Sequence, residues 1–382
     1  MKKILLGTTA LAATLVSGAA LAESPIELKL GGYFQAYGIY QDTDQTDLRS
    51  TYITQRGRIY VKGSTTLDNG ITVGVFTAIK AGEAGNLEGS NGIIKKAYGF
   101  FEGSFGRIEV GAGDGAASQM GYTSPDPAPA SGVNSGNFYA NAPVSNIAGA
   151  IASTTPSTYQ NWDAQNTKVS YFTPRMSGFQ FGVSYTPNDC QTGPSSGSDN
   201  CPGLGNASVD NAGLQSEVYA FGTNYTNTFG GVDTSISATY MTATLDDTGV
   251  TAVAKDYSDY AEKDRESYSF GANLGYKEWT LGGSYLHDNK GLVANETDAW
   301  DLGLKYTVGA FSVGVQHIES TTDLDSREDN VKATMIGAGY AVGPGVNLGI
   351  GVQDWSWDST EDTSLDYQSD AKMILIGTVL NF

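Results

Sequence analysis

Positively charged side chains recur at alternate positions in one short segment of the chain. Arg56 and Arg58 are followed by Lys62, and in an extended strand these three side chains point to the same face. The guanidinium groups keep their charge at any accessible pH. Such a stripe contains no nucleophile or base, so its chemistry would be the electrostatic sorting of charged solutes. An isolated charged stripe is also typical of an ordinary solvated face.

Other charged residues are candidates to extend this stripe or to face it. The residues that we expect on one water-facing wall are Arg56, Arg58, Lys62, Lys80, Lys96 (or its neighbour Lys95), Arg107 and Glu109. Asp114 and Asp126 lie in a long segment, 114–165, that several prolines would stiffen. A basic wall opposite an acidic segment would sort solutes by size and charge, with a field felt over about 8 Å at physiological salt.

Catalytic and metal-binding residues are scarce in this sequence. The two histidines, His287 and His317, share the face of apolar residues in their alternating segments. No nucleophile elbow, zinc-binding histidine pair or phosphate-binding glycine loop is present in the sequence. Asp42 and Asp44 have the first spacing of a calcium loop, but the glycine and closing glutamate that the loop requires are missing. We therefore expect no enzyme activity, no metal site and no cofactor.

The composition excludes several classes of protein. Only 16% of the 382 residues are charged, against about 25% in soluble domains, whereas the chain contains 49 glycines and 22 tyrosines. The net charge of −19 argues against a nucleic-acid partner, which requires clustered Lys and Arg. After the first 22 residues no run of 18 apolar residues could form a spanning helix.

The start of the chain predicts export from the cytoplasm. Lys2 and Lys3 precede an apolar run that ends in Ala20-Leu-Ala22, which predicts a signal peptide over 1–22 and a mature domain over 23–382. Cys190 and Cys201 lie in a stretch rich in Gly, Ser, Pro and Asn. In an oxidising compartment this pair predicts a local disulfide that closes one exposed loop.

The elements that must position these residues are β-strands. Apolar and polar or small residues alternate throughout, for example at Trp300, Leu302 and Leu304. We predict sixteen strands, at 26–40, 51–66, 71–81, 93–103, 106–113, 166–173, 177–186, 214–227, 232–244, 266–277, 279–288, 297–307, 311–319, 331–342, 345–356 and 370–382. Short and long connections between the strands alternate strictly along the chain, as in a membrane-spanning barrel that has short connections at one end and long ones at the other. The barrel must be closed because lipid cannot satisfy an open sheet edge.

Several motifs point to a known family. They are Asn166-Thr-Lys-Val-Ser-Tyr171, Thr173-Pro174, Gly178-Phe179, Tyr185, Ala97-Tyr98, Gly103-Ser-Phe-Gly-Arg107, Gly111 and the terminal Phe382. With these motifs the sequence resembles the general bacterial porins, sixteen-stranded outer-membrane channels that assemble as homotrimers. The resemblance implies that 114–165 folds inward as a constriction loop and that Phe382 is an outer-membrane assembly signal. Ala112 departs from the family, since many relatives have arginine there.

These observations predict an all-β protein: a sixteen-stranded antiparallel transmembrane β-barrel for passive diffusion of ions and small hydrophilic solutes. Its surroundings would be outer-membrane lipid and lipopolysaccharide. Acidic residues in 246–266 and 358–370, which we place in long external loops, predict weak cation preference, although Arg56 and Arg58 oppose it. The alternatives are a substrate-specific channel and an adhesive or plugged barrel. The predicted inward residues are mostly Gly, Ser, Thr and Asn, which argues against a plug.

Overall fold

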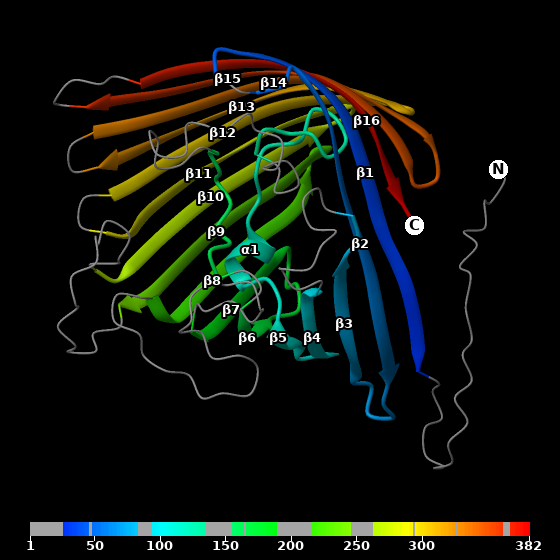
Figure 1. The fold of residues 1–382 in the computed structure, drawn as a ribbon. Coiled ribbons are helices and arrows are strands. Elements are labelled where there is room, and N and C mark those ends of the chain that lie inside the picture. The colour runs from blue at the N-terminus through cyan, green and yellow to red at the C-terminus, as the bar shows by residue number, and fades with distance from the viewer. Residues whose placement is uncertain are drawn as a thin grey trace.

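The chain forms one closed barrel of antiparallel strands. The computed structural model describes residues 26–45, 48–82, 94–134, 155–163, 166–188, 215–245, 263–292, 295–324, 327–361 and 367–382. These residues form sixteen strands and one short helix, which lies within the barrel (Figure 1). No helix in these ranges is long and apolar enough to span a membrane. The predicted signal peptide and both cysteines lie outside the described residues.

Neighbours in sequence are neighbours in the sheet. The first half of the barrel consists of β1 (Glu27–Thr43), β2 (Thr51–Thr66), β3 (Thr72–Lys80), β4 (Ile94–Gly103), β5 (Gly106–Ala112), α1 (Ala116–Met120), β6 (Thr167–Phe172), β7 (Phe179–Asn188) and β8 (Gln215–Phe229). The second half consists of β9 (Val232–Leu245), β10 (Arg265–Tyr276), β11 (Trp279–Leu292), β12 (Asn295–Val308), β13 (Phe311–Leu324), β14 (Arg327–Gly343), β15 (Val346–Glu361) and β16 (Tyr367–Asn381). The pairing of β1 with β16 closes the barrel, so the predicted fold is confirmed.

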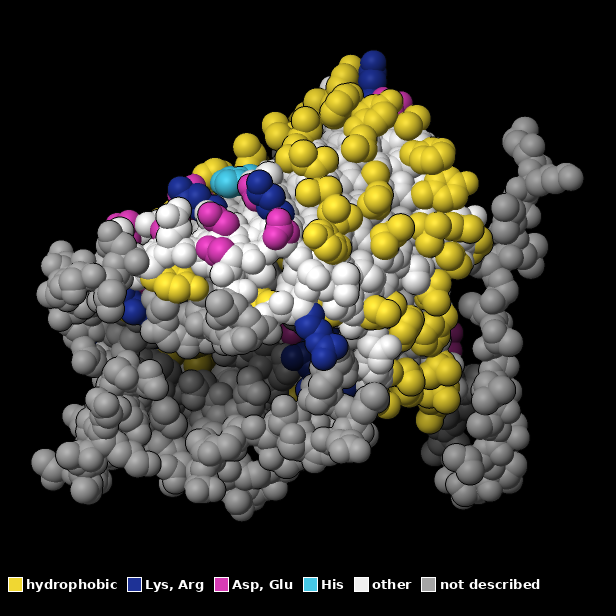
Figure 2. Space-filling view, turned by 45° about the horizontal axis from the view of Figure 1, so that its top comes forward, with side chains coloured by type: hydrophobic (Ala, Val, Ile, Leu, Met, Phe, Trp, Pro, Cys, Tyr) yellow, Lys and Arg dark blue, Asp and Glu magenta, His cyan; other side chains and the backbone are white. Residues whose placement is uncertain are grey.

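The outer face of the wall is apolar. Side chains that would be buried in a soluble protein are exposed here, with Ile53 81% and Ile376 64% accessible. Figure 2 shows hydrophobic side chains crowding the outer wall, whereas charged side chains and a histidine gather towards one end. Exposing such side chains to water costs about 1.5–3 kcal/mol each, and a hydrocarbon layer removes that cost. Aromatic side chains beside the short connections are also exposed: Phe105, Phe179, Phe229, Trp279 and Phe311.

The strands at the end of the chain are longer than the sequence predicts. Asp358 was expected in a loop but lies within β15, and β16 begins at Tyr367 rather than at Asp370. Asp358 and Asp370 alternate with buried neighbours and so face outward, not into the mouth of the barrel. The ladder of backbone hydrogen bonds continues beyond the apolar layer, where outward side chains meet water and acidic residues are tolerated.

The inner wall is not uniformly polar. Small and polar side chains predominate on the inner faces of β7 to β11, although Val218, Met241 and Leu286 are also buried there. The inner faces of β14 to β16 and β1 are mainly apolar. Their buried residues include Tyr37, Met335, Trp355, Trp357, Met373 and Leu375. The prediction of mostly Gly, Ser, Thr and Asn is therefore wrong for this quarter of the wall. Ala128 and Val133, from the segment between β5 and β6, pack on these residues and exclude water from them.

Candidate functional site

The cationic stripe of β2 lies on the inner face of the barrel. Thr54 pairs with the buried Tyr37 of β1, and both point inward. Arg56, Arg58 and Lys62 continue the same face by alternation. Arg58 is opposite Lys80 of β3, which places a second cationic strand beside the first.

The charged inner face continues across β4 and β5. Lys96 pairs with the buried Ala78, whereas Lys95 falls in a register shift between β3 and β4, so Lys96 is the residue in inward register. The Arg107 guanidinium donates to Glu109 Oε1 at 2.7 Å and to Glu102 Oε2 at 2.7 Å.

Two cations of this wall enclose an aromatic ring. Phe100 is 1% exposed, and the Lys62 Nζ lies 4.9 Å from its ring centroid. The Arg107 guanidinium carbon lies 4.2 Å from the same centroid. Both distances are within the range of a cation–π interaction, so Phe100 fixes the positions of two charges on neighbouring strands.

The connection between β5 and β6, residues 113–166, follows the inner wall. We call it the third connection, and its residues 135–154 and 164–165 lie outside the described ranges. It begins with an ion pair between Asp114 and Lys96. Then α1 packs on the inner faces of β6 to β9. This path places the described start of the connection inside the barrel.

Asp301 of β12 anchors the third connection to the opposite part of the wall. This carboxylate is 3% exposed and accepts hydrogen bonds from the Ser124 backbone N–H at 3.0 Å and hydroxyl at 2.6 Å. It also accepts from Asn134 Nδ2 at 2.6 Å and from the Ser284 hydroxyl at 2.6 Å. Charge-assisted bonds of this kind are about twice as strong as neutral ones. Three of the four donors belong to the connection.

The connection then reaches β14, β15 and β1. The Tyr37 hydroxyl donates to the Pro129 carbonyl, and Gln353 Nε2 donates to the Ser131 carbonyl at 3.2 Å. Gly339 permits this close approach, because a Cβ there would lie 2.7 Å from Pro129 Cδ. Asp126 lies in this stretch, next to Gly132. The prolines predicted to stiffen the segment thus lie against the wall.

A buried ion pair joins the two ends of the third connection. Lys168, whose side chain is 2% exposed, donates to the carbonyls of Gly113 at 2.7 Å and Asp163 at 2.6 Å. Its Nζ lies 3.5 Å from the Asp163 carboxylate, which is 1% exposed. Burial raises the pKa of Asp163, although Lys168 and a hydrogen bond from Thr186 oppose this shift. One ammonium group therefore fastens both the start and the end of the connection.

The lumen is therefore bounded by two chemically different surfaces. One is the described part of the third connection, which lies along β6 to β15 and includes Tyr159. Burial, together with the nearby charges of Asp114 and Asp126, raises the pKa of Tyr159. The other surface is the partly exposed inner face of β2 to β4, with Arg56, Lys62 and Lys80.

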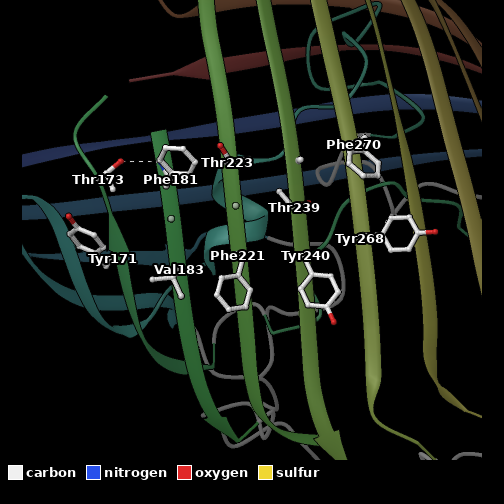
Figure 3. Close-up of a pocket in the computed structure, with 13 residues that line it drawn as sticks. Tyr171, Thr173, Phe181, Val183, Phe221, Thr223, Thr239, Tyr240, Tyr268 and Phe270 are labelled. Carbon is white, nitrogen blue, oxygen red and sulfur yellow. Dashed lines mark hydrogen bonds between the residues drawn. The ribbon is translucent and has the colours of Figure 1, made fainter. Parts of the chain in front are cut away.

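An apolar groove on the outer face is separate from this lumen. It has a volume of about 700 Å³ and is bordered by the rings of Phe181, Phe221, Tyr240 and Phe270. Figure 3 views these rings from the side of the strands opposite α1, which identifies the outer face. His287, which stacks on Tyr268, also lies outside the lumen, as the sequence predicts. Among the described residues no group of three potential ligands could hold a metal ion.

A closed barrel with an apolar outer face and a charged inner wall defines a transmembrane β-barrel protein. A family model described as Gram-negative porin matches residues 7–356. The chain belongs to the Gram-negative porin family and is an outer-membrane protein. The resemblance found in its sequence motifs is confirmed.

Curated relatives are distant. An uncharacterized protein of Rickettsia prowazekii is 24% identical over 212 residues, which cover 47% of this chain and 48% of that protein. The chain thus matches about half the length of this relative. An uncharacterized protein of Rickettsia bellii is 23% identical over 358 residues, 83% of this chain and 76% of that protein.

Solved structures share the fold at low sequence identity. An anion-selective porin from Comamonas acidovorans has a TM-score of 0.62 at 16% identity and covers 94% of this chain and 100% of its own. A mutant of Rh. blastica porin has a TM-score of 0.57 at 19% identity, with 93% and 100% covered. A loop-deletion mutant of OmpT of Vibrio cholerae has a TM-score of 0.59 at 12% identity, with 93% and 99% covered.

Proposed function

We propose that this protein is a passive, water-filled channel for ions and small hydrophilic solutes in the outer membrane. The observation that carries the proposal is the third connection, which is fastened to the inner wall at Asp301 and Lys168. A connection held against the wall narrows a barrel without filling it. The charged inner face of β2 to β5 then forms the other side of the passage.

We further propose that this narrowing is the constriction, with residues 114–165 on one side of it. The residues expected to border it are Arg56, Arg58, Lys62, Lys80, Lys96, Arg107, Glu109, Asp114 and Asp126. A pore lined in this way discriminates by size and charge without binding its solutes tightly. No catalytic role is required of any of these residues.

The selectivity of the channel depends on two opposing regions. The weak cation preference predicted from the sequence depends on acidic residues at the external end, many of which lie in 246–262, outside the described residues. We propose that Arg56, Arg58, Lys62 and Lys80 oppose this preference, because a Debye length of about 8 Å would bring a permeating ion within reach of their charges. These regions act in series, so we propose that the net preference is weak.

The partners proposed for the channel follow from its family. We propose a homotrimer in contact with outer-membrane lipid and lipopolysaccharide, with Phe382 as the assembly signal. The terminal residue is already part of the wall, since Phe382 and Gly32 exchange backbone hydrogen bonds of 2.9 and 3.1 Å. Mass measurement of the detergent-solubilised protein tests the trimer.

Swelling of liposomes that contain the purified protein tests the channel function. Sugars of graded size should enter at rates that fall smoothly with molecular mass, because the passage selects by size. Entry of one sugar alone would support the alternative of a substrate-specific channel. No swelling with any small sugar would contradict the proposal and favour an adhesive barrel.

A further inference from the structure

Four aromatic side chains form a continuous row on the inner face of β1 to β4. Tyr33 and Tyr60 have ring centroids 6.3 Å apart, Tyr60 and Phe76 are 5.7 Å apart, and Phe76 and Tyr98 are 5.2 Å apart. We call these residues the aromatic row. All four side chains are partly exposed, so their rings are in contact with one another and with the lumen.

The barrel does not need rings at these positions. The corresponding inner faces of β9 and β10 contain Ser237, Thr239, Ser267 and Ser269, and that part of the wall closes equally well. The apolar inner face of β14 to β16 is covered by the third connection, which accounts for its composition. The aromatic row lies on the other side of the lumen, where it is partly exposed, and its composition therefore points to a solute.

Cations lie at both ends of the aromatic row along the channel axis. Arg58 and Lys80, paired across β2 and β3, lie on the external side of Tyr60 and Phe76. Lys62 and Arg107, which enclose Phe100, lie on the periplasmic side. Arg58 and Lys62 are four residues apart, which is about 13 Å along a strand. Arg58 is only 4% exposed, and the charge of Arg107 is offset by Glu102 and Glu109. Lys80 and Lys62, the latter directly opposite Phe76, are therefore the cations that a solute on the rings meets.

We propose that the aromatic row is a binding track for small aromatic carboxylates. This inference rests on the proposed channel function and names a solute class for it. An aromatic carboxylate has a flat apolar ring that stacks on Tyr60 and Phe76 and an anionic group that pairs first with Lys80. As the ring moves along the row, the carboxylate reaches Lys62. Each contact is weak, so the solute is held briefly and released, as permeation requires.

Conductance of single channels in planar bilayers tests the proposal, with benzoate as the probe. Benzoate at millimolar concentration should reduce the chloride current. The reduction by acetate or cyclohexanecarboxylate at the same concentration should be smaller by about threefold or more. The chloride current alone tests the proposed channel function, and the reduction of that current by benzoate tests the aromatic row. A failure of the channel proposal can therefore be distinguished from a failure of the binding proposal. Equal effects of benzoate and acetate on the wild-type channel would overturn the proposal.

Phe76→Leu isolates the contribution of the rings. It should raise the benzoate concentration for half-block by about three- to tenfold and leave the effect of acetate unchanged. Phe101→Leu, on the outer face of β4, is the matched control and should behave as the wild type. If Phe76→Leu does not assemble, Tyr60→Leu serves the same purpose. If a conducting Phe76→Leu or Tyr60→Leu channel is blocked by benzoate as strongly as the wild type, the proposal is overturned. It is also overturned if the neutral sugar maltose blocks the wild type more strongly than benzoate does and this block depends on Phe76.

Discussion

Replacement of Asp301 by asparagine should release the third connection from the wall while the barrel stays intact. The carboxylate accepts three hydrogen bonds from Ser124 and Asn134, each of them charge-assisted. Bonds to a charged acceptor contribute about 1.5–3 kcal/mol each. The sum for the three bonds is therefore about 4.5–9 kcal/mol, and the measured loss will be smaller because neighbouring bonds are not additive.

Hydrogen exchange of the segment 124–134 measures this loss directly. A loss of only 1.4 kcal/mol accelerates exchange from the detached state by about tenfold, so we expect at least that effect in Asp301→Asn. The same variant should give larger and noisier single-channel currents, because the connection no longer keeps one position in the lumen.

Asp298→Asn is the matched control for this experiment. Asp298 lies on the same strand, but on the outer face, where it accepts from Tyr285 and contacts His287. This variant should leave exchange in 124–134 and the current noise unchanged. Wild-type exchange in a folded Asp301→Asn protein would refute the assignment of Asp301 as the anchor.

Three further predictions concern the charged wall and the base of the third connection. Arg56→Ser with Arg58→Ser should raise cation over anion permeability by about two- to fourfold per charge, measured as the reversal potential in a KCl gradient; an unchanged potential would remove both residues from the constriction. Lys168→Met leaves the buried Asp163 unpaired and should lower the free energy of unfolding by about 3–5 kcal/mol, which a lower temperature of heat-induced unfolding would show. Adding Asp163→Asn to the same chain should restore part of the lost stability. Burial raises the pKa of Asp163. The contribution of Asp163 to stability is therefore greatest below about pH 4 and is lost as the pH rises through the raised pKa. The unfolding temperature of the wild type, relative to that of Asp163→Asn, should fall over that pH range, and a constant difference would argue against the pKa shift.

Local alternation was sufficient to predict the strands and the shared face of Arg56, Arg58 and Lys62 on β2. The period-two pattern of β2 requires only that Ile53 face lipid for Arg56 and Arg58 to face inward, and in the observed register both lie on the face of Thr54, which is opposite the buried Tyr37. Closure of the barrel follows from the physics of lipid rather than from any single residue. These features were therefore accessible from the sequence.

The register shift between β3 and β4 could not be predicted. It places Lys96 inward and displaces Lys95, but two adjacent lysines give no signal that distinguishes them. The length of β15 was also missed, because Asp358 is a poor strand former whose extended conformation depends on pairing with Gln368 of β16.

The path of the third connection depends on contacts between distant parts of the chain. In the sequence, Asp301 is one polar residue in an alternating strand. No local pattern indicates its contact with Ser124, which is 177 positions away. Lys168 lies within the motif that indicated the family, yet its role as a fastener depends on carbonyls at both ends of a long connection. The apolar inner wall did leave a signal, since Trp355 and Trp357 alternate out of phase with the lipid-facing residues of β15.

The barrel is proposed to enclose an open aqueous passage. Single-channel recording of the purified protein in planar bilayers tests it most directly, with KCl concentration as the variable. We expect discrete steps of current whose conductance rises nearly in proportion to KCl concentration, as diffusion through water requires. An absence of current steps from folded, inserted protein would contradict the account, as would a conductance that saturates at low salt.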